Sequence, residues 1–353
     1  MEELFGRRSA TRRSILKAGS VALAAPFVIR PQSARSAQSI VVASYGGAWA
    51  EAMTEAFHKP FTKETGIEVV VAAGTDLAKA KAQVQTKNVE WDVVELSNGW
   101  LATGMRDGLW EKIDTSVVDM SGTTPGSQAE HAIGLCLVSG GFAWRADKKR
   151  AAEAPKDWSD FWDVAKYPGR RGMMTRVTST LEYALMADGV DAKKLYPLDV
   201  DRAFKSLDKI KPAVTNWVNA MPQTISLLQT GEVDYVTSAA GRVFIAKRQG
   251  IPLAYATDCA LVDVTRVAIL KGTKKFDLAQ RHLAFQLMPD RQAHFAELTS
   301  YTPTKTEAIG RLSPELLSLS PDLKGPKTAM SDEFWWSTRF DELTRRFKEW
   351  QLT

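Results

Sequence analysis

The chain has 353 residues and a formal net charge of +5, from 46 basic and 41 acidic residues. Residues 1–37 hold seven Lys or Arg and two Glu, so the rest of the chain carries 39 charges of each sign and no net charge. The basic balance therefore belongs to the N-terminal segment, and we expect no nucleic-acid partner. The four histidines show no metal-ligand spacing, so no metal and no cofactor is expected.

The first 37 residues are typical of a secretory leader. Arg12 and Arg13 precede a modestly apolar run over 18–29, and small residues follow at 34–37. This order predicts a cleaved twin-arginine signal peptide over 1–37 and export to the bacterial periplasm, with a disordered basic tail as the alternative. The apolar run is too short to span a bilayer, and no later stretch is long enough. The mature chain of roughly 315 residues is long for one domain and sufficient for two.

The first predicted elements are a strand, a helix and a second strand. Residues 40–43 are uniformly apolar and too few for a helix, which indicates a buried strand. Apolar residues at helical spacing over 49–61 predict a helix that Pro60 kinks or ends and Gly66 closes. β-Branched residues over 67–72 predict a second, parallel strand. The unit indicates an α/β fold, in which ligands bind beyond the carboxyl ends of the strands.

The loop after the first strand lies at such an end. Gly46 and Gly47 free its backbone of side chains, so Tyr45 and Trp49 are candidates to face a ligand. A tight turn with a core tryptophan explains the same residues. For Trp49 the two interpretations are balanced, because it also lies on the apolar stripe of the helix.

A second candidate loop follows a helix predicted over 77–87 and a strand predicted over 91–96. Asn98 and Trp100 come directly after this strand, so they are candidates for the same reason as Tyr45. A helix N-cap at Ser97 or Asn98 accounts for the same pattern.

The later part of the chain predicts a second lobe. A strand over 173–175 runs into the polar stretch 176–180, and a strand over 233–236 ends at 238–242. Three crossings between the lobes are predicted, at 133–144 with a break at 139–141, at 264–270 and at 301–304. They divide the mature chain into lobe 1, residues 38–139 plus 266–300, and lobe 2, residues 140–265 plus 301–353. A C-terminal helix is predicted over 331–350.

Several short stretches together suggest a family. They are YGGAW at 45–49, FHKPFTKETGIEVVV at 57–71, YPGRRG at 167–172, LEYALMADGV at 181–190, KLYPLDVDRAF at 194–204, LLQTGEVDY at 227–235, AFQLMPDRQAHFAEL at 284–298 and YTPTKTEA at 301–308. Each is weak alone, but together they run through nearly all of the mature chain. In this order they resemble the periplasmic solute-binding proteins of ATP-driven (ABC) importers, specifically the spermidine/putrescine-binding family.

The resemblance implies the type II periplasmic binding fold, in which two α/β lobes, each a mixed sheet flanked by helices, close on a small solute. It implies a monomer that does no chemistry, and whose closed form is recognised by an ABC permease in the inner membrane.

The residues that would bind the ligand depart from the polyamine-binding pattern. At three places where that family has acidic groups, this chain has Arg176 with Ser179, Asn219 near Trp217, and Thr265 with Arg266. In addition, Ala239 and Ala240 stand where the family has an aromatic residue and Asn, shortly before Arg242. An ammonium group buried opposite guanidinium is unfavourable, whereas Arg binds a carboxylate in bidentate fashion. We therefore expect a small anionic or zwitterionic solute, such as an amino acid or organic acid, with Asp263 for an amino group.

Alternatives stay open at this point. Each arginine could instead be a solvated or salt-bridged surface residue, and the ligand could be a polyamine as in the family. An exported hydrolase is the alternative from another class, although no Gly-x-Ser-x-Gly, His-Glu-x-x-His, phosphate-loop or Cys-x-x-Cys motif is present. A chemoreceptor accessory protein would share the fold. Cys136 and Cys259 either form one bridge or are two buried thiols, and their apolar surroundings favour thiols.

Overall fold

The computed structural model describes residues 38–97 and 99–353, so the predicted export signal and Asn98 lie outside the described residues. The described strands pair into one eleven-stranded mixed sheet in the order β2-β1-β3-β9-β4-β7-β5-β6, with β8 and β10 on β4 and β11 on β9. They are β1 (Ser39–Ser44), β2 (Glu68–Ala73), β3 (Val93–Leu96), β4 (Ala132–Arg145), β5 (Arg171–Met174), β6 (Val214–Val218), β7 (Tyr235–Ala239), β8 (Leu253–Tyr255), β9 (Leu261–Ile269), β10 (Thr302–Pro303) and β11 (Ala329–Met330).

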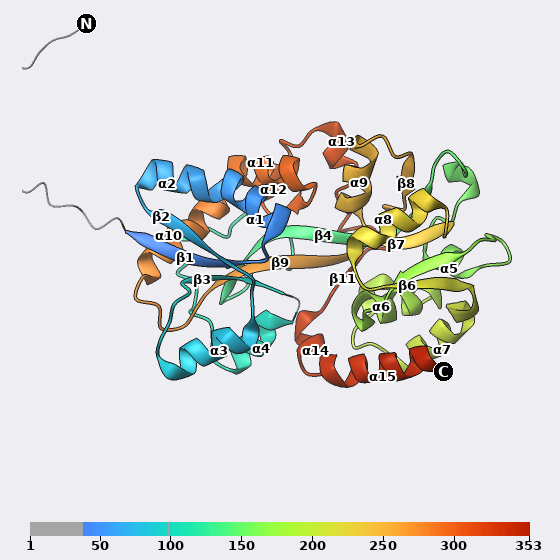
Figure 1. Ribbon diagram of the computed structural model, residues 1–353, viewed down its shortest axis with the longest axis horizontal. Coiled ribbons are helices and arrows are strands. Elements are labelled where there is room, and N and C mark those ends of the chain that lie inside the picture. The colour runs from blue at the N-terminus through green and yellow to red at the C-terminus, as the bar shows by residue number, and fades with distance from the viewer. Residues whose placement is uncertain (1–37, 98) are drawn as a thin grey trace, which may run out of the picture. The chain divides into compact units, whose positions relative to one another are not determined.

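Helices cover both faces of this sheet (Figure 1). The α-helices are α1 (Gly47–Met53), α2 (Lys59–Thr65), α3 (Leu77–Thr86), α4 (Trp100–Arg106), α5 (Trp158–Trp162), α6 (Val177–Ala187), α7 (Val200–Ile210), α8 (Met221–Thr230), α9 (Ala240–Arg248), α10 (Phe276–Gln286), α11 (Pro289–Thr299), α12 (Thr306–Ile309), α13 (Pro314–Leu317), α14 (Glu333–Ser337) and α15 (Phe340–Leu352). A π-helix, η1 (Thr54–His58), and three short 3₁₀ helices, η2 (Ala151–Glu153), η3 (Ala192–Lys194) and η4 (Lys211–Ala213), complete the helices.

The predicted first unit is confirmed. β1 pairs in parallel with β2 and also with β3, and Gly66 ends α2 in the left-handed conformation. Pro60 does not end the helix, because α1, η1 and α2 follow one another without a gap. The helical segment is instead irregular just before Pro60, where η1 forms a π-helix. A proline removes a hydrogen bond and crowds the preceding turn, and the wider π turn accommodates both effects.

The sheet has separate cores at its two ends. At the end formed by β2, β1 and β3, which we call the first lobe, one cluster packs around Phe57 and Phe295 and another around Trp91 and Trp110. The end formed by β7, β5 and β6 is the second lobe. Two hydrophobic clusters, one larger and one smaller, cover the two faces of the sheet there. Figure 1 shows α1, α2 and α11 on one side of the first lobe and α3 and α4 on the other. Contacts join the described residues into one unit, so the exact lobe boundaries stay a prediction.

Strands β4 and β9 run through both lobes, where the first two crossings were predicted. β4 is continuous through the predicted break at 139–141. Gly140 is required there, because a Cβ at this position would lie 2.4 Å from the Tyr183 hydroxyl oxygen. The glycine therefore lets a second-lobe side chain lie directly against the shared strand.

The third crossing differs from the prediction at 301–304. β10 pairs with β4, and the Thr304 hydroxyl donates to the Gly134 carbonyl at 2.7 Å. Lys305 Nζ donates to the Ser121 carbonyl at 2.6 Å, so these polar contacts keep the segment with the first lobe. β11 then joins β9 and leads to α14. We place the crossing between α12 and β11.

The predicted C-terminal helix is two helices. Asp332 caps α14 by accepting a hydrogen bond from the backbone of Trp335 at 3.0 Å. The chain leaves helical geometry at Arg339, where φ is −124°, and α15 begins at the next residue. The break separates α14 from α15, and α15 packs against α6 of the second lobe (Figure 1).

Candidate functional site

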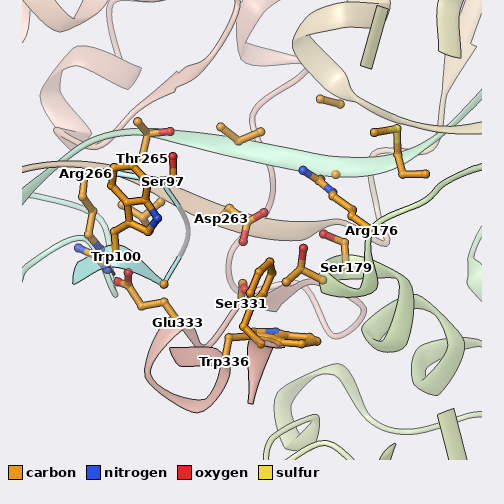
Figure 2. A pocket seen from close by; sticks show the side chains of 18 of the residues that line it. Ser97, Trp100, Arg176, Ser179, Asp263, Thr265, Arg266, Ser331, Glu333 and Trp336 are labelled. Atoms are coloured by element: carbon orange, nitrogen blue, oxygen red, sulfur yellow. Dashed lines mark hydrogen bonds and ion pairs between the residues drawn. The ribbon is translucent and has the colours of Figure 1, made fainter. Parts of the chain in front are cut away.

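A cavity of about 920 Å³ lies between the two lobes. Nine of the twelve predicted site residues line it: Tyr45, Trp49, Trp100, Arg176, Ser179, Arg242, Asp263, Thr265 and Arg266. They come from loops after β1, β3, β5 and β7 and from β9 itself, so the parallel strands do direct their carboxyl ends at one space, as predicted. In Figure 2, Trp100, Thr265 and Arg266 lie at one end, Arg176 and Ser179 at the other, and Asp263 between them.

The first-lobe wall is held by a buried carboxylate. Glu95 Oε2 accepts from the backbone N–H of Tyr45 at 3.0 Å and from Trp49 Nε1 at 2.7 Å. The Tyr45 hydroxyl donates to the Leu96 carbonyl at 2.5 Å. The polar atoms of Tyr45 and Trp49 are thus used within the protein, and their rings are what they offer to the cavity. Gly46 and Gly47 have φ of 84° and 55°, which favours glycine in this turn.

Trp49 lies both against the first-lobe core and at the cavity. Its ring packs edge-on against Phe295, with centroids 5.2 Å apart, and against Tyr45 at 5.5 Å. It therefore belongs to the first-lobe core and also reaches the cavity. Burial raises the pKa of Glu95 to about 7, although hydrogen bonds from Tyr45 and Trp49 favour its charged form.

The second-lobe wall contains a strained turn. Ser179 has φ of 70° and Thr178 has ψ of 142°, so the helical part of α6 begins only after Ser179. A non-glycine residue in this region is uncommon and costs about 1–3 kcal/mol. Ser179, Thr180 and Tyr183 all line the cavity. Strain of this kind is frequent at ligand sites, which supports the prediction for this turn.

The three predicted arginines differ in their surroundings. Among the described residues, Arg176 and Arg242 are exposed on the cavity wall and make no hydrogen bond or ion pair. Arg266 is buried: its Nε donates to Glu333 Oε1 at 2.5 Å and its Nη atoms donate to the Ser127 and Gly126 carbonyls at 2.9 and 2.7 Å. Its charge is therefore compensated within the protein, which fits the salt-bridge alternative rather than ligand binding.

Two predicted residues lie away from the cavity and one cannot be placed. Trp217 packs against Phe347 and Trp350 of α15, with ring centroids 5.8 Å apart in both cases. Asn219 is exposed and accepts a hydrogen bond from the Thr175 hydroxyl. Neither Trp217 nor Asn219 is among the residues that line the cavity, although Met221, two residues after Asn219, is. Asn98 lies outside the described residues.

The sequence interpretation missed the C-terminal wall. Ser331, Glu333, Trp336, Ser337 and Phe340 line the cavity, and Figure 2 shows the first three on the side below Asp263. The only signal was the polar start of an aromatic helix at 331–336, which a core helix explains equally well.

Three further findings concern the cysteines, membrane-spanning helices and metal ligands. Cys136 and Cys259 are both buried free thiols, as favoured. Over residues 38–97 and 99–353, no helix has the length and apolar character needed to cross a membrane. Within the same residues, no group of three or more His, Cys, Asp or Glu could hold a metal ion.

Comparison with known proteins shows the family. Residues 56–316 match the bacterial extracellular solute-binding protein family. A γ-aminobutyric acid (GABA)-binding protein of Pseudomonas aeruginosa is 36% identical over 324 residues, covering 89% of this chain and 91% of that protein. The spermidine/putrescine-binding periplasmic protein of Escherichia coli is 25% identical over 294 residues, covering 80% and 82%.

A solved GABA receptor superposes with a TM-score of 0.82 at 32% identity, covering 89% of this chain and 98% of the receptor. The solved neighbours are periplasmic binding proteins of the type II fold, so the predicted fold class and the predicted resemblance are both confirmed. This protein belongs to the bacterial extracellular solute-binding protein family.

Proposed function

We propose that this protein is the periplasmic substrate-binding component of an ABC importer, and that its solute is a small molecule with a carboxylate, of the amino-acid or organic-acid type. The observation that carries the proposal is the pair of guanidinium groups, Arg176 and Arg242, that line the cavity and form no salt bridge among the described residues. Guanidinium is the side-chain group that best matches a carboxylate.

The balance of charge in the cavity supports this class of ligand. Arg266 and Glu333 neutralise each other, and Arg106 lies 3.6 Å from Asp107. The other charged side chains of the lining are Arg176, Arg242, Asp263 and Asp341. A polyamine would bring two or more ammonium groups close to the two guanidinium groups, and an uncompensated charge in a closed site costs several kcal/mol. A zwitterion fits better, because its carboxylate can bind guanidinium while its amino group binds Asp263.

The relatives support the same choice. GABA carries an amino group and a carboxylate at opposite ends, and the GABA-binding relative is more similar to this chain than the polyamine-binding one. Asp263 lies between the two ends of the cavity and Arg176 at one of them (Figure 2), an arrangement suited to an extended ω-amino acid. We therefore infer a ligand of the GABA type.

Isothermal titration with GABA, succinate and putrescine tests the ligand. We expect GABA to bind with a Kd in the micromolar range, equivalent to about −8 kcal/mol, and putrescine not to bind. Arg176→Ala should weaken GABA binding about 10- to 150-fold, because a hydrogen bond to a charged group contributes about 1.5–3 kcal/mol. Arg248→Ala is the matched control, since Arg248 is exposed on the same lobe and is not part of the cavity lining.

Two outcomes would overturn the ligand proposal: tight putrescine binding without binding of either carboxylate, or GABA binding that Arg176→Ala leaves unchanged. The first would leave the transport role intact with a polyamine as solute. We also expect the bound solute to be released unaltered, which NMR spectra of GABA incubated with the protein can establish. Appearance of a new product would instead favour an exported enzyme.

We also propose that residues 1–37 direct twin-arginine export, and that the mature protein acts as a monomer that docks on an inner-membrane permease. Replacing both Arg12 and Arg13 by Lys should retain the precursor in the cytoplasm, because the export signal depends on the arginine pair. Cell fractionation and immunoblotting measure this retention. Unchanged export of the double variant would refute the assignment of the leader.

A further inference from the structure

The short helix α14 contacts both lobes within a single turn. It follows β11, which is paired to β9 at Leu261–Val262, and it packs against α4 of the first lobe. Its residues Glu333 and Trp336 also line the cavity, where they lie on the side below Asp263 (Figure 2). The helix is therefore part of the cavity wall and a link between the lobes at once.

Glu333 fastens α14 to the first lobe. Its carboxylate accepts from Arg266 Nε at 2.5 Å, with the two side chains only 17% and 9% exposed. Arg266 lies on β9 opposite Leu96 of β3, and its Nη1 and Nη2 donate to the carbonyls of Ser127 and Gly126. The guanidinium is thus fixed in one orientation by first-lobe atoms, and Glu333 is bound to a rigid partner.

Trp336 fastens the same helix to the second lobe. Its Nε1 donates to Glu182 Oε1 at 2.6 Å, and the Tyr196 hydroxyl donates to the same oxygen at 2.5 Å. Glu182 lies on α6 and is fully buried. Trp336 belongs to the second-lobe core, and the adjacent Trp335 packs edge-on against Tyr196 with centroids 5.7 Å apart. This end of α14 is therefore fixed by both packing and hydrogen bonding.

We propose that α14 is a strut that limits the separation of the lobes, and that Glu333 is a positioning residue for solute binding although its charge is directed at Arg266. The two fastenings are three residues apart, about 4.5 Å along a helix, so the lobes cannot separate widely without breaking one of them. A site held near its binding geometry loses less conformational freedom when the solute binds. Measuring the effect on solute affinity rests on the proposed function, whereas measuring the distance between the lobes does not.

The lobe separation can be measured by double electron–electron resonance between spin labels. Gln85→Cys on α3 and Lys205→Cys on α7 provide exposed sites, one on each lobe, and the two native cysteines are buried. In the solute-free protein we expect a narrow distance distribution. Glu333→Gln should broaden it toward longer distances, and Glu342→Gln, an exposed position on α15 outside the cavity lining, should leave it unchanged.

The affinity arm uses titration with GABA. Glu333→Gln should weaken binding about tenfold, within the usual range of conformational coupling, and saturating GABA should restore the narrow distribution. If this variant does not fold, Arg266→Met with Glu333→Leu removes both charges together, so neither is left buried and alone. The same broadening is expected from that double variant.

The proposal is overturned if the distance distribution of Glu333→Gln or of the double variant matches that of Glu342→Gln. If no carboxylate solute binds the wild-type protein, the proposed function fails, while the distance measurement still decides whether α14 is a strut.

Discussion

Two buried histidines should make the protein sensitive to acid. His58 and His282 are 2% and 0% exposed, and their ring centroids are 5.3 Å apart. Among the described residues, none of their four ring nitrogens has a hydrogen-bond partner. Burial lowers the pKa of His58 to about 4, and burial together with the neighbouring His58 lowers the pKa of His282 well below its usual value. Both rings are therefore neutral in the folded protein at pH 7.

The sign of the effect follows from the unfolded state. An exposed histidine has a pKa of about 6.5, so between pH 6.5 and 4 the unfolded chain binds more protons than the folded chain, and stability falls as the pH falls. Because folding lowers the pKa of His58 from 6.5 to about 4, the free energy of unfolding should fall by about 2 kcal/mol between pH 7.5 and pH 5.0. The pKa of His282 is lowered in the same direction, so its protonation adds to this loss, and the pair should remove more than the roughly 2 kcal/mol that His58 removes alone.

Urea unfolding at pH 7.5 and 5.0 measures this loss. Other groups also titrate, so the informative quantity is the difference between the wild type and His58→Leu/His282→Leu. Over this pH interval the free energy of unfolding of the double variant should fall by at least about 2 kcal/mol less than that of the wild type, whatever its stability at pH 7.5. His294→Gln, at an exposed position, should behave as the wild type does. An equal loss in the double variant and the wild type would refute the reasoning.

Three further predictions concern buried groups. Burial raises the pKa of Glu182 to about 7, so the protonated carboxyl favours the folded state at low pH. The free energy of unfolding should therefore fall by about 2 kcal/mol through this group between pH 5.0 and 7.5. Urea unfolding should show that Glu182→Gln abolishes this loss, and an unchanged loss would contradict the prediction. Gly140→Ala should lower the free energy of unfolding by about 1–3 kcal/mol, because the added Cβ displaces Tyr183; an unaltered Tm would speak against this contact. Ellman titration should find Cys136 and Cys259 reactive only after denaturation, without prior reduction; no reactive thiol in denaturant would indicate a bridge.

Local patterns were sufficient to predict the first α/β unit, whereas the type II fold was predicted from the family resemblance. The apolar run at 40–43, the helical spacing that follows and the glycine at 66 are all signals from neighbouring residues, and they give β1, the helical segment and β2 as observed. The same reasoning placed most of the candidate residues on the cavity wall, because the carboxyl ends of parallel strands converge.

The parts that could not be predicted depend on residues far apart in the sequence. Arg266 was expected at the ligand, but its counter-ion Glu333 lies 67 positions later, and no local pattern reveals that pairing. Trp217 was expected in the cleft, yet α15 returns to cover it. Polar contacts of Thr304 and Lys305 keep this segment with the first lobe, so the third crossing comes later in the sequence than the apolar pattern alone could indicate.

The continuity of β4 has a consequence for attempts to divide the protein. Ile133 and Leu135 at its start belong to the first-lobe core, and Phe142 and Trp144 near its end belong to the second. An excised half would therefore lose part of a central strand and expose apolar residues that the other half now covers. Fragments made for crystallography or for split reporters should keep β4, β9 and β11 intact, and any inserted domain is better placed in an exposed turn.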